Sequence, residues 1–171
     1  FDNLCRFAKG LSVAVITLTP APVGTPFEQE VKRLTALSST AMREGLVLAM
    51  LTHREGITGD PVAALRLCRS VPGLGLTLDP SHFVAGGAKE SDVDQLFPYV
   101  QNMHLRDTGK HPGEFQVRIG QGQIEYARIA NLLNRAGSKR ALTVAILDLP
   151  ENNFDREVDV RKLRLLLETL L

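Results

Sequence analysis

The segment Leu46-Val-Leu-Ala-Met-Leu51 is a short apolar run, and the pair Asp60-Pro61 follows it along the chain. An apolar run of this length between polar segments predicts a strand buried on both faces. The pair predicts the start of a helix over 62–70, because Asp caps free N–H groups and Pro suits the first helical position. The next apolar run, Leu74-Gly-Leu-Thr-Leu78, begins just after that helix. Strand, helix and strand in this order predict parallel strands joined by a crossover helix.

The same unit recurs on both sides of this stretch. Upstream, we predict a strand over 11–17 and a helix that starts at the capping box Thr25-Pro-Phe-Glu28 and ends before Gly45. Downstream, the segment Asp79-Pro-Ser-His82 is expected to be a turn, and Ser91 is expected to cap a short helix that reaches about residue 100. The remaining elements expected are a strand over 101–105, a helix over 124–136, a strand over 141–147 and a closing helix over 158–171. Five parallel strands, each followed by a helix, predict an α/β fold.

Composition limits the class of protein. The chain has 171 residues, of which 44% are hydrophobic and 23% charged, so we predict one globular domain over 1–171 and not a disordered chain. The formal net charge of +1 argues against a nucleic-acid partner and against a polybasic membrane surface. No apolar run approaches the roughly 20 residues of a membrane helix. The two cysteines, Cys5 and Cys68, cannot form a disulfide framework, which favours a reducing, cytoplasmic location.

Polar and ionisable side chains gather where the predicted strands end. Asp79 and His82 follow one strand, and His104 lies at the end of the next. Because parallel strands end at the same rim, where such folds place their sites, we expect these three side chains to share one pocket. Thr52 and Asp148 also follow strands, but loop residues that cap a helix or bind water explain them at least as well.

Several segments together resemble the xylose isomerase-like TIM-barrel superfamily, which includes sugar isomerases, epimerases and their endonuclease IV relatives. The segment 74–82 resembles that family's "glglDpsH" motif, and 101–107 resembles its "v-x-H-x-H-l-r-D" strand, with Asn102 where a first His is common. Three more segments have family counterparts in the same order: 46–56, 117–124 and 141–150. The resemblance covers essentially the whole chain and implies a (β/α)8 TIM-barrel type of fold.

The resemblance also implies a site, in which Glu, Asp, His and Glu at the strand ends hold a divalent metal and the two glutamates move a proton. Asp79 and His104 stand at the Asp and His positions, whereas Leu51 and Ala145 stand at the two Glu positions. Neither Leu nor Ala can bind a hard cation or accept a proton. The resemblance therefore implies a degraded site that is weakly active or inactive and binds a small sugar or sugar phosphate.

The remaining polar groups at the rim are assigned by their positions. We expect Asp79, His104 and His82 to be the ligands of any metal that is retained, with Mn²⁺, Zn²⁺ or Mg²⁺ as candidates and weak binding expected. We expect His53, His82 and Arg106 to contact the substrate.

Two other functions stay open at this point. If Glu55 or Asp148 bends toward the rim, the chain is an active, metal-dependent sugar isomerase or epimerase with substitute ligands. An endonuclease IV-like DNA repair enzyme is the weaker alternative, since it needs a richer metal site and a basic groove.

Length adds one more expectation. A full barrel of this type has eight strands and about 250 residues. The five predicted strands match the last five of the family, so the first three βα units have no counterpart in 1–171. An open sheet of this kind exposes two edges. We therefore expect either that further units lie outside this sequence, or that a second copy pairs with it in a homo-oligomer, or that the sheet closes differently.

Overall fold

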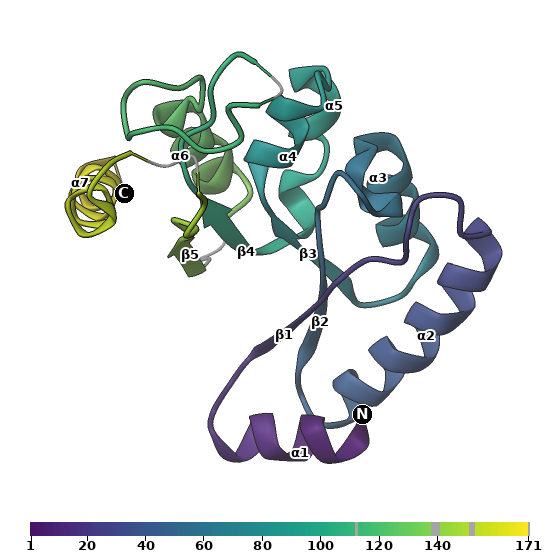
Figure 1. The fold of residues 1–171 in the computed structure, drawn as a ribbon. Coiled ribbons are helices and arrows are strands. Elements are labelled where there is room, and N and C mark those ends of the chain that lie inside the picture. The colour runs from purple at the N-terminus through teal and green to yellow at the C-terminus, as the bar shows by residue number, and fades with distance from the viewer. Residues whose placement is uncertain (112, 138–140, 151–152, 171) are drawn as a thin grey trace.

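The computed structural model describes residues 1–171 except 112, 138–140, 151–152 and 171. Five parallel strands form one sheet in the order β1-β2-β3-β4-β5, so each strand pairs with its neighbours in sequence (Figure 1). The strands are β1 (Val15–Leu18), β2 (Val47–Leu51), β3 (Leu74–Leu78), β4 (Val100–Leu105) and β5 (Ala141–Val144). The helices are α1 (Asp2–Gly10), α2 (Phe27–Arg43), α3 (Pro61–Ser70), α4 (Pro80–Ala85), α5 (Glu90–Asp94), α6 (Tyr126–Arg135) and α7 (Arg156–Leu170), with short 3₁₀ turns at Ile57–Gly59 and Phe97–Tyr99.

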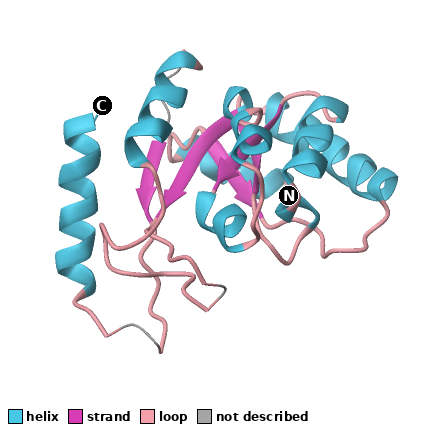
Figure 2. Ribbon diagram, turned by 90° about the horizontal axis from the view of Figure 1, so that it is seen from above, coloured by secondary structure: helices cyan, strands magenta, loops and turns pink. Residues whose placement is uncertain are grey.

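The sheet curls into a half-barrel, which confirms the predicted class of fold. Its outer face is apolar and packs in the main core, through Ile16, Leu48, Met50, Leu76, Leu78, Met103 and Leu105. Its inner face carries smaller or polar residues, and the hydroxyls of Thr17 and Thr77 meet at 2.7 Å across the intervening strand β2. Contact between strands that are not neighbours requires the face they share to be concave. The two chain ends lie at opposite ends of the sheet (Figures 1 and 2).

An irregularity in β4 sets the direction of the site residues. Val100 pairs with Leu76 and Met103 pairs with Leu78, and the register shifts between Leu76 and Thr77. Leu76 and Leu78 are two positions apart on β3, whereas their partners Val100 and Met103 are three positions apart on β4. The extra residue on β4 is a bulge. After the bulge, the alternation of side chains along β4 is shifted by one residue, so that odd-numbered residues such as Met103 face the core and even-numbered residues face the concave side. His104 therefore shares the concave face with Thr77 rather than the core.

Several details of the prediction were wrong. The capping box at Thr25 is not formed, since α2 begins at Phe27 without a side-chain cap, and Glu28 lies 3.8 Å from Arg66 instead. The helix attributed to a Ser91 cap begins at Glu90, also without a side-chain cap, and ends at Asp94. The predicted turn after β3 is the helix α4.

Further errors lie at the two edge strands of the sheet, β1 and β5. Residues 2–10 form the unpredicted helix α1, so β1 begins only at Val15. At the other edge β5 ends at Val144 instead of residue 147, because the Leu147 backbone bonds to the Gln116 side chain.

Elsewhere the prediction held. β3 has its predicted bounds, Asp60 caps α3 by accepting from the Val62 amide at 3.0 Å, and the closing helix runs from Arg156, with residue 171 outside the described residues. In the part of the chain described, no helix is long and apolar enough to cross a membrane.

Candidate functional site at the rim of the half-barrel

Asp79 lies at the carboxyl end of β3 and is held from two sides. Its backbone amide donates to the Thr52 hydroxyl at 2.8 Å, and its Oδ1 accepts from the Ser81 amide at 3.1 Å, which caps α4. Thr52 thus holds the backbone at the end of β3. These bonds fix the carboxylate at the rim, where only 1% of the side chain is exposed.

The second oxygen of Asp79 faces a buried arginine. Arg106 Nη1 lies 2.8 Å from Asp79 Oδ2, and Arg106 Nε donates to the Ala145 carbonyl at 2.9 Å. Burial raises the pKa of Asp79, and the Arg106 guanidinium opposes that shift. The sequence placed Arg106 at the rim but gave no sign that it pairs with the carboxylate predicted to bind metal.

His82, on the first turns of α4, lies beside this pair as a neutral imidazole. Its Nδ1 accepts from the Arg54 backbone amide at 3.4 Å, so the tautomer assigned from this bond carries its proton on Nε2. Nε2 is 3.8 Å from Asp79 Oδ2, too far for a hydrogen bond. Burial, with added repulsion from His53 and Arg106, lowers the pKa of His82 to about 3.

Two aromatic contacts complete this cluster. The His53 and His82 rings are 4.3 Å apart, and the Phe115 ring lies 4.8 Å from His82. The guanidinium carbons of Arg54 and Arg106 lie 5.2 Å and 4.9 Å from the centre of the Phe115 ring. The sequence analysis identified neither Phe115 nor Arg54. Nothing in a single sequence indicates that the 108–124 loop folds back over the rim.

The two positions without a carboxylate lie on the same concave face. Leu51 pairs with Thr77, two residues before Asp79, and His104 pairs with Thr143, two residues before Ala145. By strand alternation, Leu51, Asp79, His104 and Ala145 therefore lie on one face of successive strands. Burial lowers the pKa of His104, with the Asp79 charge opposing the shift. The four positions named by the family resemblance are thus together, but only two carry a donor.

This arrangement does not fit a divalent cation. One oxygen of Asp79 accepts from an amide and the other faces Arg106, so a second cation would meet a guanidinium. Neutral His82 presents an N–H, not a lone pair, toward Asp79. Among the described residues, no group of three or more His, Cys, Asp or Glu side chains is placed to hold a metal ion.

Two other polar residues that follow strands lie outside the cluster. Asp107 is buried and accepts from the amides of Thr108, Gly120, Gly122 and Ile124, so it organises the 108–124 loop. Asp148 is exposed and pairs with Arg156 at 2.9 Å. Neither carboxylate contacts the Asp79–Arg106 pair in the structure.

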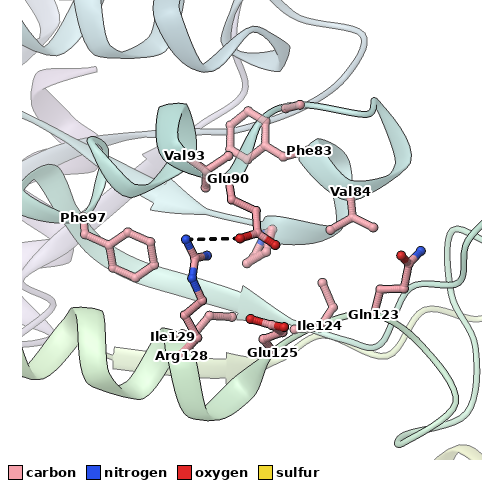
Figure 3. A pocket seen from close by; sticks show the side chains of 12 residues that line it. Phe83, Val84, Glu90, Val93, Phe97, Gln123, Ile124, Glu125, Arg128 and Ile129 are labelled. Carbon is pink, nitrogen blue, oxygen red and sulfur yellow. Dashed lines mark ion pairs between the residues drawn. The ribbon is translucent and has the colours of Figure 1, made fainter.

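A partly open pocket of about 80 Å³ lies between α4, α5 and the start of α6 (Figure 3). Its walls are mainly apolar, with Phe83, Val93 and Ile129 among them, and the ion pair of Glu90 and Arg128 spans 3.4 Å at its side. It contains no group suited to proton transfer beyond paired or solvent-facing carboxylates. The chemistry is therefore concentrated at the open rim, not in this pocket.

The five parallel strands, curled into a half-barrel, define a partial α/β barrel of the TIM type. A family model described as "Xylose isomerase-like TIM barrel" matches residues 1–165, and the chain belongs to that family. A search of curated proteins found no match.

Solved structures show the same fold at low sequence identity. A xylose isomerase-like TIM-barrel protein from Mycobacterium smegmatis, in complex with magnesium, is 13% identical, with a TM-score of 0.78 over 99% of this chain and 65% of its own. A D-tagatose 3-epimerase-like protein is 17% identical, with a TM-score of 0.77 over 99% of this chain and 66% of its own. An L-ribulose 3-epimerase is 17% identical, with a TM-score of 0.70 over 99% and 66%. The chain therefore spans about two thirds of the length of these structures.

Proposed function

We propose that this chain is a sugar isomerase/epimerase-like barrel protein with a degraded metal and acid–base site, which binds a small sugar-like ligand at the rim with little or no turnover. One observation carries the proposal. Leu51 and Ala145 share the concave face with Asp79 and His104, at the positions where the family resemblance implies glutamates. The fold of the site is kept while its two acid–base groups are absent.

The groups that remain are poorly suited to the family's chemistry. Moving a proton on the carbon next to a carbonyl needs a base within hydrogen-bond reach whose pKa is near the working pH. Leu51 and Ala145 have no proton-accepting side-chain atom. Asp79 is committed to Arg106 and Ser81, and His82 has its free lone pair on an amide and a pKa of about 3. What remains at the rim is a set of hydrogen-bond donors and one aromatic face, which can bind and orient a ligand.

Restoring the glutamates tests this proposal. Loss of an acid–base group typically costs about 10²–10⁴-fold in rate, so we expect no measurable epimerisation of D-tagatose or isomerisation of D-xylose by the unmodified chain with Mn²⁺. The double variant Leu51→Glu/Ala145→Glu should gain Mn²⁺ affinity in calorimetry, because each new carboxylate neutralises charge on the ion. The matched control is Leu51→Gln/Ala145→Gln, which adds similar bulk without charge and should gain nothing.

The same measurements separate the alternatives. Tight, stoichiometric Mn²⁺ binding with turnover by the unmodified chain would overturn the proposal in favour of an active isomerase with substitute ligands such as His53, Glu55 or Asp148. Binding of duplex DNA that weakens steeply with added salt would favour the endonuclease-like alternative instead.

A further inference from the structure

We propose that the pocket between α4, α5 and the start of α6 is a second binding site, which takes a small amine that carries a short branched apolar group. The apolar group lies between the helices, and the ammonium lies at the mouth. This inference goes beyond the proposed function, since the residues that line the pocket are distinct from the Asp79–Arg106 cluster at the rim.

The inner walls of the pocket are apolar and largely removed from water. Phe83 comes from α4, Phe97 from the turn after α5 and Ile129 from α6, and all three side chains are buried (Figure 3). An apolar group that enters such a space leaves water, which is favourable. The volume of about 80 Å³ is roughly half that of a cavity of about 150 Å³ that holds benzene. We therefore expect a group no larger than isobutyl.

The mouth of the pocket carries more negative than positive charge. Glu90 from α5 and Arg128 from α6 meet there at 3.4 Å, and Arg128 also pairs with Asp94 at 2.7 Å (Figure 3). Glu125 lines the pocket as well and forms no ion pair with any residue that the structure describes. Lys89 is exposed and lies outside the lining. Three carboxylates thus surround one guanidinium, and the N-terminus of α6 adds only about half a positive charge.

The hydrogen bonds at the mouth also leave acceptors in excess. Arg128 donates to Asp94 Oδ2, whereas Asp94 Oδ1 is buried and has no hydrogen-bond partner within the described part of the chain. An ammonium has three donors and no acceptor, and its bonds to carboxylates are stronger than those of a neutral hydroxyl. An anion of the same shape would meet like charges instead. The apolar walls and the acidic mouth together match an amphipathic amine.

The test compares three probes with the same branched skeleton: isobutylamine, isobutanol and isobutyrate. Each is titrated at low salt into the ¹⁵N-labelled chain, and amide NMR shifts report both the affinity and the place of binding. We expect isobutylamine to shift amides of α5 and the start of α6 and to bind roughly tenfold tighter than isobutanol, as for a charge-assisted hydrogen bond. Isobutyrate should bind more weakly than isobutanol, and added salt should weaken binding of the amine alone.

Two charge variants should act in opposite directions. Glu125→Gln should weaken amine binding about two- to fivefold, a modest effect because an exposed charge is screened by solvent. Arg128→Gln frees Glu90 and Asp94 for the ammonium and should strengthen amine binding by a similar factor. Isobutanol binding should change in neither variant. The matched control is Glu28→Gln on α2, which removes one charge from a carboxylate that is 84% exposed and outside the pocket, and it should leave amine affinity unaltered.

A third variant tests the apolar part of the site. Ala88→Leu adds bulk to the lining and should abolish binding of amine and alcohol alike, with folding checked by circular dichroism. Equal affinity for isobutylamine and isobutanol, amine binding that Glu125→Gln leaves unchanged, shifts confined to the rim, or no binding of any probe would overturn the inference. Each of these results leaves the proposed function standing, whereas turnover of a sugar with Mn²⁺ would overturn the proposed function alone.

Discussion

Arg106 is the residue that most changes what the rim can do. A buried ion pair such as Arg106–Asp79 contributes little net stability, because desolvation of both charges offsets their attraction. Removing one partner is far more costly, at about 3–5 kcal/mol, since the other charge stays buried alone. Substitution of Asp79 or Arg106 alone is therefore expected to destabilise the fold more than replacement of both residues. While Asp79 keeps its place at the end of β3, its compensating charge must come either from a bound cation or from a residue such as Arg106.

A second buried carboxylate, Glu30 on α2, gives a prediction of pH dependence. Arg33 donates to both its oxygens at 2.7 Å, and the Ala21 amide donates to one of them at 3.3 Å. Burial acts to raise the pKa of Glu30, but these bonds outweigh it and the net shift is downward. A carboxyl with a lowered pKa in the folded state stabilises the protein at neutral pH and loses that contribution as pH falls.

We therefore expect Glu30→Gln to lower the melting temperature clearly at pH 7, and the gap to the unmodified chain to narrow as pH falls below about 4.5, near the usual Glu range. Melting curves from pH 7 to pH 3 measure this. Glu28→Gln is the control, since Glu28 is 84% exposed and reaches Arg66 only at 3.8 Å, and it should show a small gap at every pH. A Glu30→Gln gap that stays constant with pH would contradict the assignment.

At the scale of elements, the 108–124 loop depends on one side chain. Asp107 accepts from four backbone amides along that loop, and Gly122 approaches it too closely for any side chain. We expect Asp107→Ala to cost roughly 3 kcal/mol, because buried amides lose a charged acceptor, and to open the loop to proteolysis. Since the loop carries Phe115, affinity for the rim ligand should fall as well.

Urea unfolding and limited trypsin digestion, which cuts after Lys110 and Arg118 within the loop, measure both effects of Asp107→Ala. Asp148→Ala removes a carboxylate that is 79% exposed, and it should leave stability and cleavage nearly unchanged. If the Asp107 variant resists trypsin as well as the unmodified chain does, the loop is held by other contacts.

The elements differ in how far the sequence predicts them. Strands β2 and β3 were predicted almost to the residue, because strands buried between layers show as isolated apolar runs. Helix α1 was missed although its apolar residues recur at helical spacing, with Cys5 and Ala8 buried. Helix α4 has six residues, too few to show a period. The two proposed caps do not form, since α2 and α5 begin without a side-chain cap. At the site, Asp79 and His104 could be placed on one rim from strand ends alone. The Arg106 pair and the Phe115 contacts depend on the β4 bulge and on loop packing, which leave no periodic signal.

For the whole molecule, the remaining prediction is that the chain folds as one cooperative domain. A contiguous core cluster of buried residues runs from Cys5 in α1 through the outer face of the sheet to Leu167 in α7. Elements at opposite ends of the half-barrel therefore share one core, although the concave face and both sheet edges are open. Cooperative unfolding is expected when a core is shared in this way.

Two core truncations, one at each end, test this cooperativity. Leu34→Ala in α2 and Leu163→Ala in α7 remove fully buried side chains and should each cost about 2–5 kcal/mol. Because the core is shared, each variant should shift one common urea midpoint, the same by far-UV circular dichroism and by tyrosine fluorescence, which reports on Tyr99 and Tyr126. Two units of separate stability would behave differently: Leu34→Ala would split the transition, lowering the circular dichroism midpoint while the fluorescence midpoint, reported by Tyr99 before β4 and Tyr126 in α6, stayed in place. Coincident midpoints in both variants are the outcome that a half-barrel with a single core requires.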